Sequence, residues 1–317
     1  MKKENILVIG ANGQIGTVLT ETLRAHFGDT RVLATDLQSP AQEIGWFETL
    51  DVLHGERLND LVAKHQIQDI YHLAAILSAK GEQNPKWAWD INMQGLFHVL
   101  EVAKTHQCRV FFPSSIAVFG GESPKYNTPQ HAVLQPQTVY GISKVAGEHW
   151  CNYYYQKYQL DTRSVRYPGI IGYQSLPGGG TTDYAVDIYH KAVQGLRFEC
   201  FLNADTALPM MYMNDAIRAT IELMQAPAEQ VKIRTGYNIA GMSFTPSEIA
   251  DAIRKIMPNF QISYQPDFRQ AIAESWPASI DDSAARNDWH WHPAYNLDQM
   301  TQDMLWHLQE YYQHAGC

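Results

Sequence analysis

The sequence predicts an α/β fold, a doubly wound parallel sheet followed by a smaller C-terminal region. Short apolar runs rich in Val, Ile and Phe alternate with stretches of helical periodicity, which is typical of successive βαβ units. These runs are NILVIG, RVLAT, DIYHLAA, RVFFPSS and TRSVRYPG. After about residue 170 the alternation weakens, and Gly, Pro and aromatic residues become frequent. We therefore expect one domain over residues 1–170, with 210–241 returning to it, and a second over 171–209 and 242–317.

Composition limits the partners of the chain. The 317 residues are 45% hydrophobic, enough for two cores, and their net charge of −9 leaves no basic surplus to neutralise phosphates. We therefore expect a small-molecule partner, neither nucleic acid nor membrane, and a cytoplasmic protein without a signal peptide. The cysteines form no Cys-x-x-Cys pair, so neither a disulfide framework nor a thiolate zinc site is expected. They are Cys108, Cys151, Cys200 and Cys317.

The first strand-to-helix turn, GANGQIG, predicts a site for a pyrophosphate. Its glycines are Gly10, Gly13 and Gly16. The turn follows the first apolar run and precedes an apolar stripe at helical spacing over residues 15–27. Glycines at these places let the backbone turn tightly and approach a pyrophosphate at the helix N-terminus, as in Rossmann-type folds.

The residues after the next two strands bear on the choice of cofactor. Asp36 ends the second strand about twenty residues after the last glycine, where a carboxylate can accept both ribose hydroxyls. It would repel a 2′-phosphate, and Leu37 supplies no cation, so NAD is favoured over NADP. Asp51 and Val52, after the third strand, are in position to meet the adenine edge. An exposed turn aspartate is the alternative reading of Asp51.

Tyr140 and Lys144 are four residues apart and are expected to share one face of a helix. Deprotonating a substrate hydroxyl near neutral pH needs a tyrosine whose pKa, about 10 when free, is lowered by about two or three units. A nearby ammonium and an oxidised nicotinamide ring, both positive, favour the phenolate. Ser114 and Ser115 end a strand about twenty-five residues upstream, at the sheet edge where ligands of such folds bind.

Together these motifs resemble the extended short-chain dehydrogenase/reductase superfamily, which includes NAD-dependent sugar-nucleotide epimerases and dehydratases. The likeness rests on the glycine turn with Asp36, HLAA at 72–75, SSIAVFG, Tyr-x-x-x-Lys and RYPGIIG at 166–172. It implies that Tyr140 is the general base, that Lys144 lowers the tyrosine pKa and binds ribose, and that Ser115 orients the substrate oxygen. Further implied NAD contacts are Gln14, Ile15, Leu37, Leu73, Ala74, Ala75, Asn92, Tyr167 and Pro168.

Segments from both halves narrow the resemblance to the short-chain type of L-threonine 3-dehydrogenase. They are LSAKGEQNP at 77–85, PGGGTTDYAV at 177–186, MYMNDAIRATIELM at 211–224 and ESWPASIDDSAARNDWHW at 274–291. The resemblance implies oxidation of L-threonine at C3 to 2-amino-3-ketobutyrate, with NAD and without metal. The implied substrate residues are Ser78, Ser114, Ser115, Tyr140, Gly180, Thr181, Thr182 and Trp276.

Alternatives stay open for both the loop and the function. A small zwitterion needs close backbone approach and small hydrogen-bonding side chains, which PGGGTTDYAV supplies, but a flexible connection has the same composition. The rival functions are a sugar-nucleotide epimerase or dehydratase and a catalytically silent NAD(H)-sensing protein. The intact Tyr140 and Lys144 pair speaks against the sensor. The lack of an obvious basic cluster for a diphosphate speaks against the epimerase.

Two further segments of the chain are rich in aromatic residues. HWCNYYYQKY at 149–158 is either core or half of an isologous interface with the helix at about 87–107, and the superfamily resemblance favours a homodimer. WHWHP at 289–293 places two histidines on one side of an extended segment without a nearby third ligand. Packing is therefore favoured over a metal site there.

Overall fold

The computed structural model describes residues 5–40, 45–178 and 180–315, so Gly179 and Cys317 lie outside its described part. The chain divides into two compact units. Unit 1 comprises the residues up to Ser115 together with Thr138–Arg166 and Ile217–Tyr237. Unit 2 comprises Ile116–Gln137, Tyr167–Ala216 and the chain from Asn238 onward. We expected residues 116–137 in the first domain, whereas they are part of unit 2.

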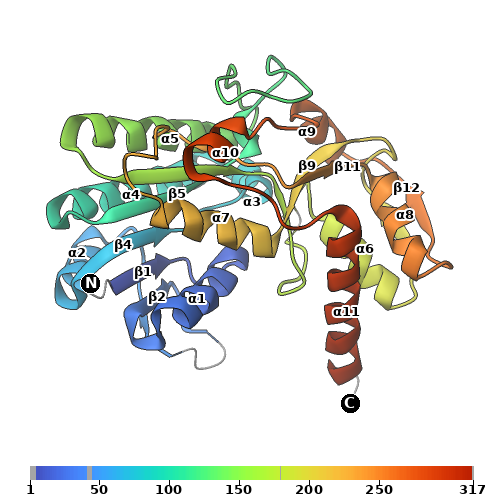
Figure 1. Ribbon diagram of the computed structural model, residues 1–317, viewed down its shortest axis with the longest axis horizontal. Helices are drawn as coiled ribbons and strands as arrows, with labels where there is room; N and C mark the ends of the chain where they lie inside the picture. Colours follow the sequence, from blue (N-terminus) through green and yellow to red (C-terminus); the bar gives the residue numbers. More distant parts are fainter. Residues whose placement is uncertain (1–4, 41–44, 179, 316–317) are drawn as a thin grey trace. The chain divides into compact units, whose positions relative to one another are not determined.

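A seven-stranded sheet in the order β10-β6-β5-β4-β1-β2-β3 forms the centre of unit 1 (Figure 1). The strands are β1 (Asn5–Ile9), β2 (Val32–Asp36), β3 (Phe47–Thr49), β4 (Ile67–His72), β5 (Arg109–Ser115), β6 (Thr162–Tyr167) and β10 (Tyr237–Asn238). Strand β1 pairs in parallel with β2 and β4, β2 with β3, and β4 with β5. This arrangement confirms the predicted α/β fold class.

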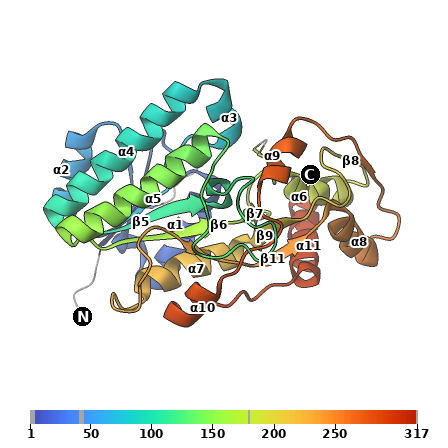
Figure 2. The ribbon, with the colours of Figure 1, turned by 90° about the horizontal axis from the view of Figure 1, so that it is seen from above.

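Helices cover both faces of this sheet, which explains why its strands read as continuous apolar runs. Figure 2 shows α2, α4 and α5 as a layer on one face, with α1 and α7 on the other. The helices are α1 (Gln14–Phe27), α2 (Gly55–His65), α3 (Ser78–Gln83), α4 (Pro85–His106), α5 (Val139–Tyr158) and α7 (Met213–Gln225), with the short 3-10 helix η1 (Asp29–Arg31). Strand residues such as Leu7, Leu33 and Ile70 are fully buried between the layers.

Unit 2 contains two small sheets. One has the order β11-β9-β7, with β11 antiparallel and β7 parallel to β9, and the other is the parallel pair β12-β8. The strands are β7 (Gly169–Ile171), β8 (Phe198–Cys200), β9 (Leu208–Tyr212), β11 (Met242–Phe244) and β12 (Ile262–Tyr264). The 3-10 helix η2 (Ile116–Val118) also lies in this unit.

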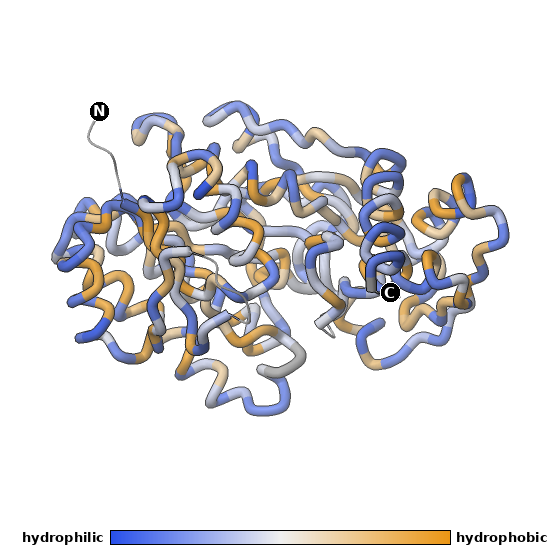
Figure 3. The backbone as a smooth tube through the Cα atoms, turned by 90° about the horizontal axis from the view of Figure 1, so that it is seen from below, coloured by the Kyte–Doolittle hydropathy of each residue, from blue (hydrophilic) through white to orange (hydrophobic). Residues whose placement is uncertain are grey.

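Helices α6, α8 and α11 of unit 2 pack against one another. The helices of this unit are α6 (Tyr184–Val193), α8 (Pro246–Ile256), α9 (Arg269–Ser275), α10 (Ser283–Trp289) and α11 (Leu297–Ala315). Thr245 and Glu248 form a reciprocal capping box that fixes the start of α8. Helix α11, which ends at the C mark in Figure 3, is mostly hydrophilic, and its buried residues Met300, Met304 and Leu308 recur every four residues on one face. Within the described ranges, no helix is both long and apolar enough to cross a membrane.

Candidate active site

The glycine turn of unit 1 is shaped by close backbone approach. Gly10 has a φ of 86°, and a Cβ on it would lie 2.7 Å from the Ala74 nitrogen. A Cβ on Gly16 would collide with the Gly10 carbonyl oxygen. Helix α1 starts directly after Gly13 with no side-chain cap and no acidic residue in its first turn. The positive end of the helix is therefore suited to an anion.

Asp36 is held beside this turn. Its Oδ2 accepts the Asn12 N–H at 2.9 Å, and its Oδ1 accepts the Leu37 N–H at 2.7 Å. The Asn12 amide in turn donates to the Gln38 carbonyl at 2.7 Å. The half-buried carboxylate has lone pairs left for the hydroxyls of a ribose. Asn12 was missed by sequence reasoning, although its place inside the turn was a signal.

The segment after β4 lies next to the same turn. The Leu73 N–H donates to the Ile9 carbonyl at 2.8 Å, and Ala74 is the backbone neighbour of Gly10. Asn92 on α4 makes a two-way contact with the Ile76 backbone, at 2.7 and 3.1 Å, and its amide reaches the Ser143 hydroxyl at 3.3 Å. Asn92 thus ties this segment to α5.

Asp51 and Val52 have roles within the protein chain itself. The Asp51 carboxylate accepts the Leu53 N–H at 2.9 Å, as in an ordinary aspartate turn. The Val52 side chain is buried against α4, where a Cβ on Gly95 would approach it to 2.9 Å. Contact of this pair with an adenine stays a prediction.

Ser115, Tyr140 and Lys144 come together at the end of β5 and the start of α5. Thr138 caps this helix by accepting the Gly141 N–H at 3.1 Å. The Tyr140 side chain hydrogen-bonds with that of Ser115. The ammonium of Lys144 lies 5.3 Å from the centre of the Tyr140 ring. The helical spacing therefore brings the Lys144 ammonium near the Tyr140 ring, as the sequence predicts, and the end of β5 brings the Ser115 hydroxyl to the same cluster.

Burial dominates the acid–base properties of this cluster. It raises the pKa of Tyr140 to about 12, and the hydrogen bond with Ser115 opposes the rise. It lowers the pKa of Lys144 to about 8, against the charges of Cys151 and Glu148. It also lowers the pKa of His72 to about 3, and the Lys144 charge adds to this effect. At neutral pH the cluster therefore holds a neutral phenol, an ammonium and a neutral imidazole.

Ser114 is buried within unit 1, and its contact with substrate stays a prediction. It is 2% exposed, and its hydroxyl donates to the Glu148 carboxylate at 2.6 Å. Arg166 donates to the same carboxylate from Nε and Nη2, at 2.8 Å each. Sequence reasoning missed Glu148 and Arg166. Glu148 follows Lys144 by four residues, and that spacing was the available signal.

Ser78 opens α3, a helix that packs against α5. The carboxylate of Glu82 on α3 accepts the Val139 N–H at 2.8 Å, directly before Tyr140. A Cβ on Gly81 would lie 3.1 Å from Val139 Cγ1. Ser78 thus belongs to a short helix that is fixed to the start of α5.

The other predicted residues, from Tyr167 and Pro168 onward, belong to unit 2. There the glycine-rich loop is organised by Asp183, whose Oδ2 accepts the N–H groups of Gly178 at 2.6 Å and Gly180 at 2.8 Å. Thr181 is buried, and the Thr182 side chain packs where a Cβ on Gly169 would come within 2.7 Å of it. In the described part of the loop, Gly178 and Gly180 thus both contact Asp183, directly before α6.

Trp276 follows α9 and is buried in unit 2. The ammonium of Lys125 donates to the Trp276 carbonyl at 2.7 Å and to the Glu274 carbonyl at 3.0 Å. The Lys125 carbonyl accepts the Ala278 N–H at 2.7 Å. The main chain around Trp276 is therefore held by a segment about 150 residues earlier, which local sequence patterns do not reveal.

The histidines of WHWHP flank a packed tryptophan. Trp291 is completely buried, and its indole N–H donates to the Ala240 carbonyl at 3.3 Å. The ring nitrogen Nδ1 of His292 lies 3.0 Å from the His290 carbonyl. Across the part of the chain that the structure describes, no three His, Cys, Asp or Glu side chains are grouped to hold a metal ion.

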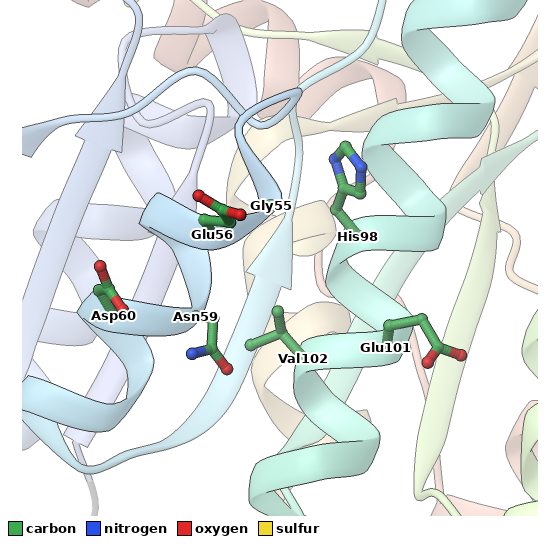
Figure 4. A pocket seen from close by; sticks show the side chains of 7 residues that line it. All are labelled: Gly55, Glu56, Asn59, Asp60, His98, Glu101 and Val102. Carbon is green, nitrogen blue, oxygen red and sulfur yellow. The ribbon is translucent and has the colours of Figure 1, made fainter.

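A surface groove of about 440 Å³ lies between α2 and α4 (Figure 4). It is lined by Gly55, Glu56, Asn59, Asp60, His98, Glu101 and Val102. Three of its polar side chains already have protein partners: His98 contacts the Val52 carbonyl, Asn59 contacts His106, and Glu101 accepts the Tyr154 hydroxyl. The groove is acidic and lacks the residue types that the chemistry above requires.

Unit 1 thus combines a glycine turn at a helix N-terminus with a tyrosine–lysine–serine cluster at the carboxyl edge of a parallel sheet, features of dinucleotide-dependent enzymes. The chain belongs to the NAD dependent epimerase/dehydratase family, whose model matches residues 6–240. An uncharacterized epimerase/dehydratase of Staphylococcus haemolyticus is 47% identical over 312 residues, which is 97% of this chain and 98% of the relative.

Two solved structures are similar over almost their whole length. A GalE-like L-threonine dehydrogenase from Cupriavidus necator, in its holo form, is 54% identical with a TM-score of 0.94, and the match covers 96% of this chain and 99% of that one. The L-threonine dehydrogenase from Clostridium difficile is 46% identical with a TM-score of 0.96, covering 98% and 99%.

Proposed function

We propose that this protein oxidises L-threonine at C3 to 2-amino-3-ketobutyrate with NAD as hydride acceptor. The observation that carries the proposal is the cluster of Ser115, Tyr140 and Lys144 beside a glycine turn with Asp36 at its edge. The likeness to L-threonine dehydrogenases at about half sequence identity supports the choice of substrate.

The residues of unit 1 fit the dinucleotide. Gly10 and Gly16 leave a cradle that a Cβ would fill, and the first turn of α1 carries no competing acidic group. Asp36 would take the ribose hydroxyls and disfavour a 2′-phosphate, so NAD is preferred over NADP. When bound, NAD would supply the hydride acceptor and a positive ring.

Tyr140 is the group that removes the hydroxyl proton of the substrate. Its hydrogen bond with Ser115 places two hydroxyls where one substrate oxygen can contact both. Because burial raises the pKa of Tyr140 to about 12, the phenolate needs positive charge nearby. Lys144 supplies one such charge, fixed by its hydrogen bond to the Pro113 carbonyl at 2.7 Å.

Residues of the glycine-rich loop, with Ser78 and Trp276, are proposed to bind the zwitterion. Gly180 offers close backbone approach, and Thr181 and Thr182 offer hydroxyl groups. The contacts of Asp183 with Gly178 and Gly180 support a defined shape for the described part of this loop. Such a shape supports a binding role over that of a passive connection.

A panel of stereoisomers tests the proposal. Purified protein with NAD should produce NADH from L-threonine, and hardly any from D-threonine or L-allothreonine, whose amino or hydroxyl groups point differently. L-Serine should be poor, because it presents a primary alcohol and lacks the methyl group. Equal rates with all four amino acids would contradict a shaped threonine pocket.

We also propose that the protein is a homodimer through α4 and α5. Trp150, Tyr153 and Tyr158 are between 36% and 41% exposed on α5, and Phe97 of α4 stacks edge-on with Trp150 at 4.8 Å. Such an aromatic face on two adjacent helices suits an isologous contact.

A further inference from the structure

The catalytic helix α5 is joined to the last three residues of β5 by side chains one helical turn apart. The three contacts are Tyr140 with Ser115, Lys144 with the Pro113 carbonyl, and Glu148 with Ser114. Helix and strand also approach closely, since a Cβ on Gly147 would lie 2.7 Å from Phe112 Cε1. The first two contacts belong to the catalytic cluster, whereas the third has no part in the proposed chemistry.

Glu148, the third of these α5 residues, is held by several contacts. It is completely buried and accepts three hydrogen bonds, two from Arg166 on the neighbouring strand β6 and one from Ser114. A Cβ on Gly236 would lie 2.9 Å from Glu148 Oε1, so the chain closes on the carboxylate from another side as well. An ion pair desolvated to this degree is weak evidence of stabilisation, because dehydrating both charges offsets much of their attraction.

We propose that Glu148, locked by Arg166, is a positioning residue that fixes the register between α5 and the end of β5, and so holds Tyr140 against Ser115. The geometry favours this role because one carboxylate contacts both β6 and the residue next to Ser115 on β5. This inference rests on the proposed function, in which Tyr140 and Ser115 meet one substrate oxygen.

A second ion pair of the same unit provides a matched control. Arg109 and Asp69 form a two-pronged pair at 2.6 and 2.7 Å, and Arg109 is the first residue of β5. Arg109 lies six residues before Ser115, about 20 Å along the strand. Asp69→Asn disturbs an ion pair on the same strand at the end away from the cluster, so it should lower the melting temperature and leave kcat unchanged.

Ser114→Ala removes only the link between Glu148 and β5. We expect kcat for L-threonine to fall about tenfold or more, since small misplacements of reacting groups are costly, with the Kd for NAD and the KM for L-threonine within about twofold of wild type. A rise in KM with unchanged kcat would place Ser114 in contact with substrate and overturn the proposal. Unchanged kcat and KM in Ser114→Ala would also overturn the proposal.

Two further variants test the proposal if Ser114→Ala lowers the stability of the protein. Glu148→Leu combined with Arg166→Leu replaces the ion pair by apolar side chains, which folded proteins often tolerate. We expect this double variant to bind NAD and to show a fall in kcat at least as large as that of Ser114→Ala. Glu148→Gln keeps an acceptor for Ser114 and should retain more kcat than the double variant. Wild-type kcat in the folded double variant would overturn the proposal, as would failure of Glu148→Gln to retain the extra activity.

A readout without substrate separates this inference from the proposed function. Hydrogen exchange of the amides of residues 138–144, measured in the NAD complex, should be faster in Ser114→Ala and unchanged in Asp69→Asn. If wild type does not oxidise L-threonine, the proposed function fails while this exchange test still decides the role of Glu148. Equal exchange in wild type and Ser114→Ala would overturn the positioning role.

Discussion

The two glycine-rich segments, GANGQIG in unit 1 and PGGGTTDYAV in unit 2, use glycine for different reasons. In the first, a Cβ on Gly16 would collide with the Gly10 carbonyl, and Gly10 itself has a positive φ. In the second, a Cβ on Gly178 would meet only the Asp183 carboxylate, at 3.7 Å, and one on Gly180 the same group at 3.1 Å. The fold thus requires glycine at Gly10 and Gly16 of the first segment.

The two units also differ in the contacts that hold their candidate site residues. Unit 1 holds its cluster by buried contacts among its own residues, as Asn92, Glu148 and Arg166 show. In the described part of the loop of unit 2, the Asp183 carboxylate accepts the N–H groups of Gly178 and Gly180. We infer that changes in unit 1 affect cofactor binding and turnover, and that changes in the loop affect KM for the amino acid.

The largest effect is expected from Gly16→Ala. The added methyl group forces the turn to shift, which overpacking data put at about 1–3 kcal/mol of folding free energy, and the pyrophosphate cradle is lost with it. Calorimetric titration should show no NAD binding at concentrations that saturate wild type. Gly178→Ala is the matched control and should bind NAD normally. Normal NAD binding by Gly16→Ala would remove the contrast between the two segments.

Tyr140→Phe tests the cluster itself. It removes the phenolic hydroxyl and keeps the ring beside Lys144, so turnover should fall by about a hundredfold or more, while the Kd for NAD changes little. Steady-state NADH formation together with a binding titration measures both quantities. Near-normal turnover would show that another group takes the proton.

Thr182→Val tests whether the glycine-rich loop of unit 2 binds the substrate. Valine keeps the shape that packs on Gly169 and removes the hydroxyl. Losing one hydrogen bond to a charged group costs about 1.5–3 kcal/mol, so KM for L-threonine should rise about 10- to 150-fold. The Kd for NAD should stay the same. An unchanged KM would favour the reading of this loop as a connection.

Asp36→Ala addresses the choice of cofactor. Removing the carboxylate takes away the acceptor for the ribose hydroxyls and the repulsion of a 2′-phosphate. The ratio of kcat/KM with NAD to that with NADP should fall by about tenfold or more, as one charged hydrogen bond predicts. Equal use of both cofactors by wild type would contradict the role given to Asp36.

The smallest change in kinetics is expected from Tyr153→Glu. A carboxylate in the exposed aromatic face of α5 should shift the protein from dimer to monomer in light scattering, because burying an unpaired charge is costly. Turnover should change by less than about twofold, since Tyr153 is far along the helix from Tyr140. A wild-type monomer would rule out the proposed interface.

Much of unit 1 was predictable from the sequence, because its features are local. The glycine turn and the pair Tyr140 and Lys144 follow from strand and helix periodicity. The ion pair of Glu148 with Arg166 was not predictable, because it depends on β6 lying beside β5. The placement of residues 116–137 in unit 2 likewise depends on distant contacts, such as those of Lys125 with the main chain around Trp276.

A comparison of L-threonine with a sugar nucleotide as substrates distinguishes a dehydrogenase from an epimerase. Purified wild-type protein is supplied with NAD and either L-threonine or a UDP-sugar, while NADH absorbance and the products are followed. We predict that L-threonine gives one NADH for each 2-amino-3-ketobutyrate formed, and that the UDP-sugar gives no product. Conversion of the sugar nucleotide without net NADH, with no reaction of L-threonine, would contradict this prediction and place the protein among the epimerases.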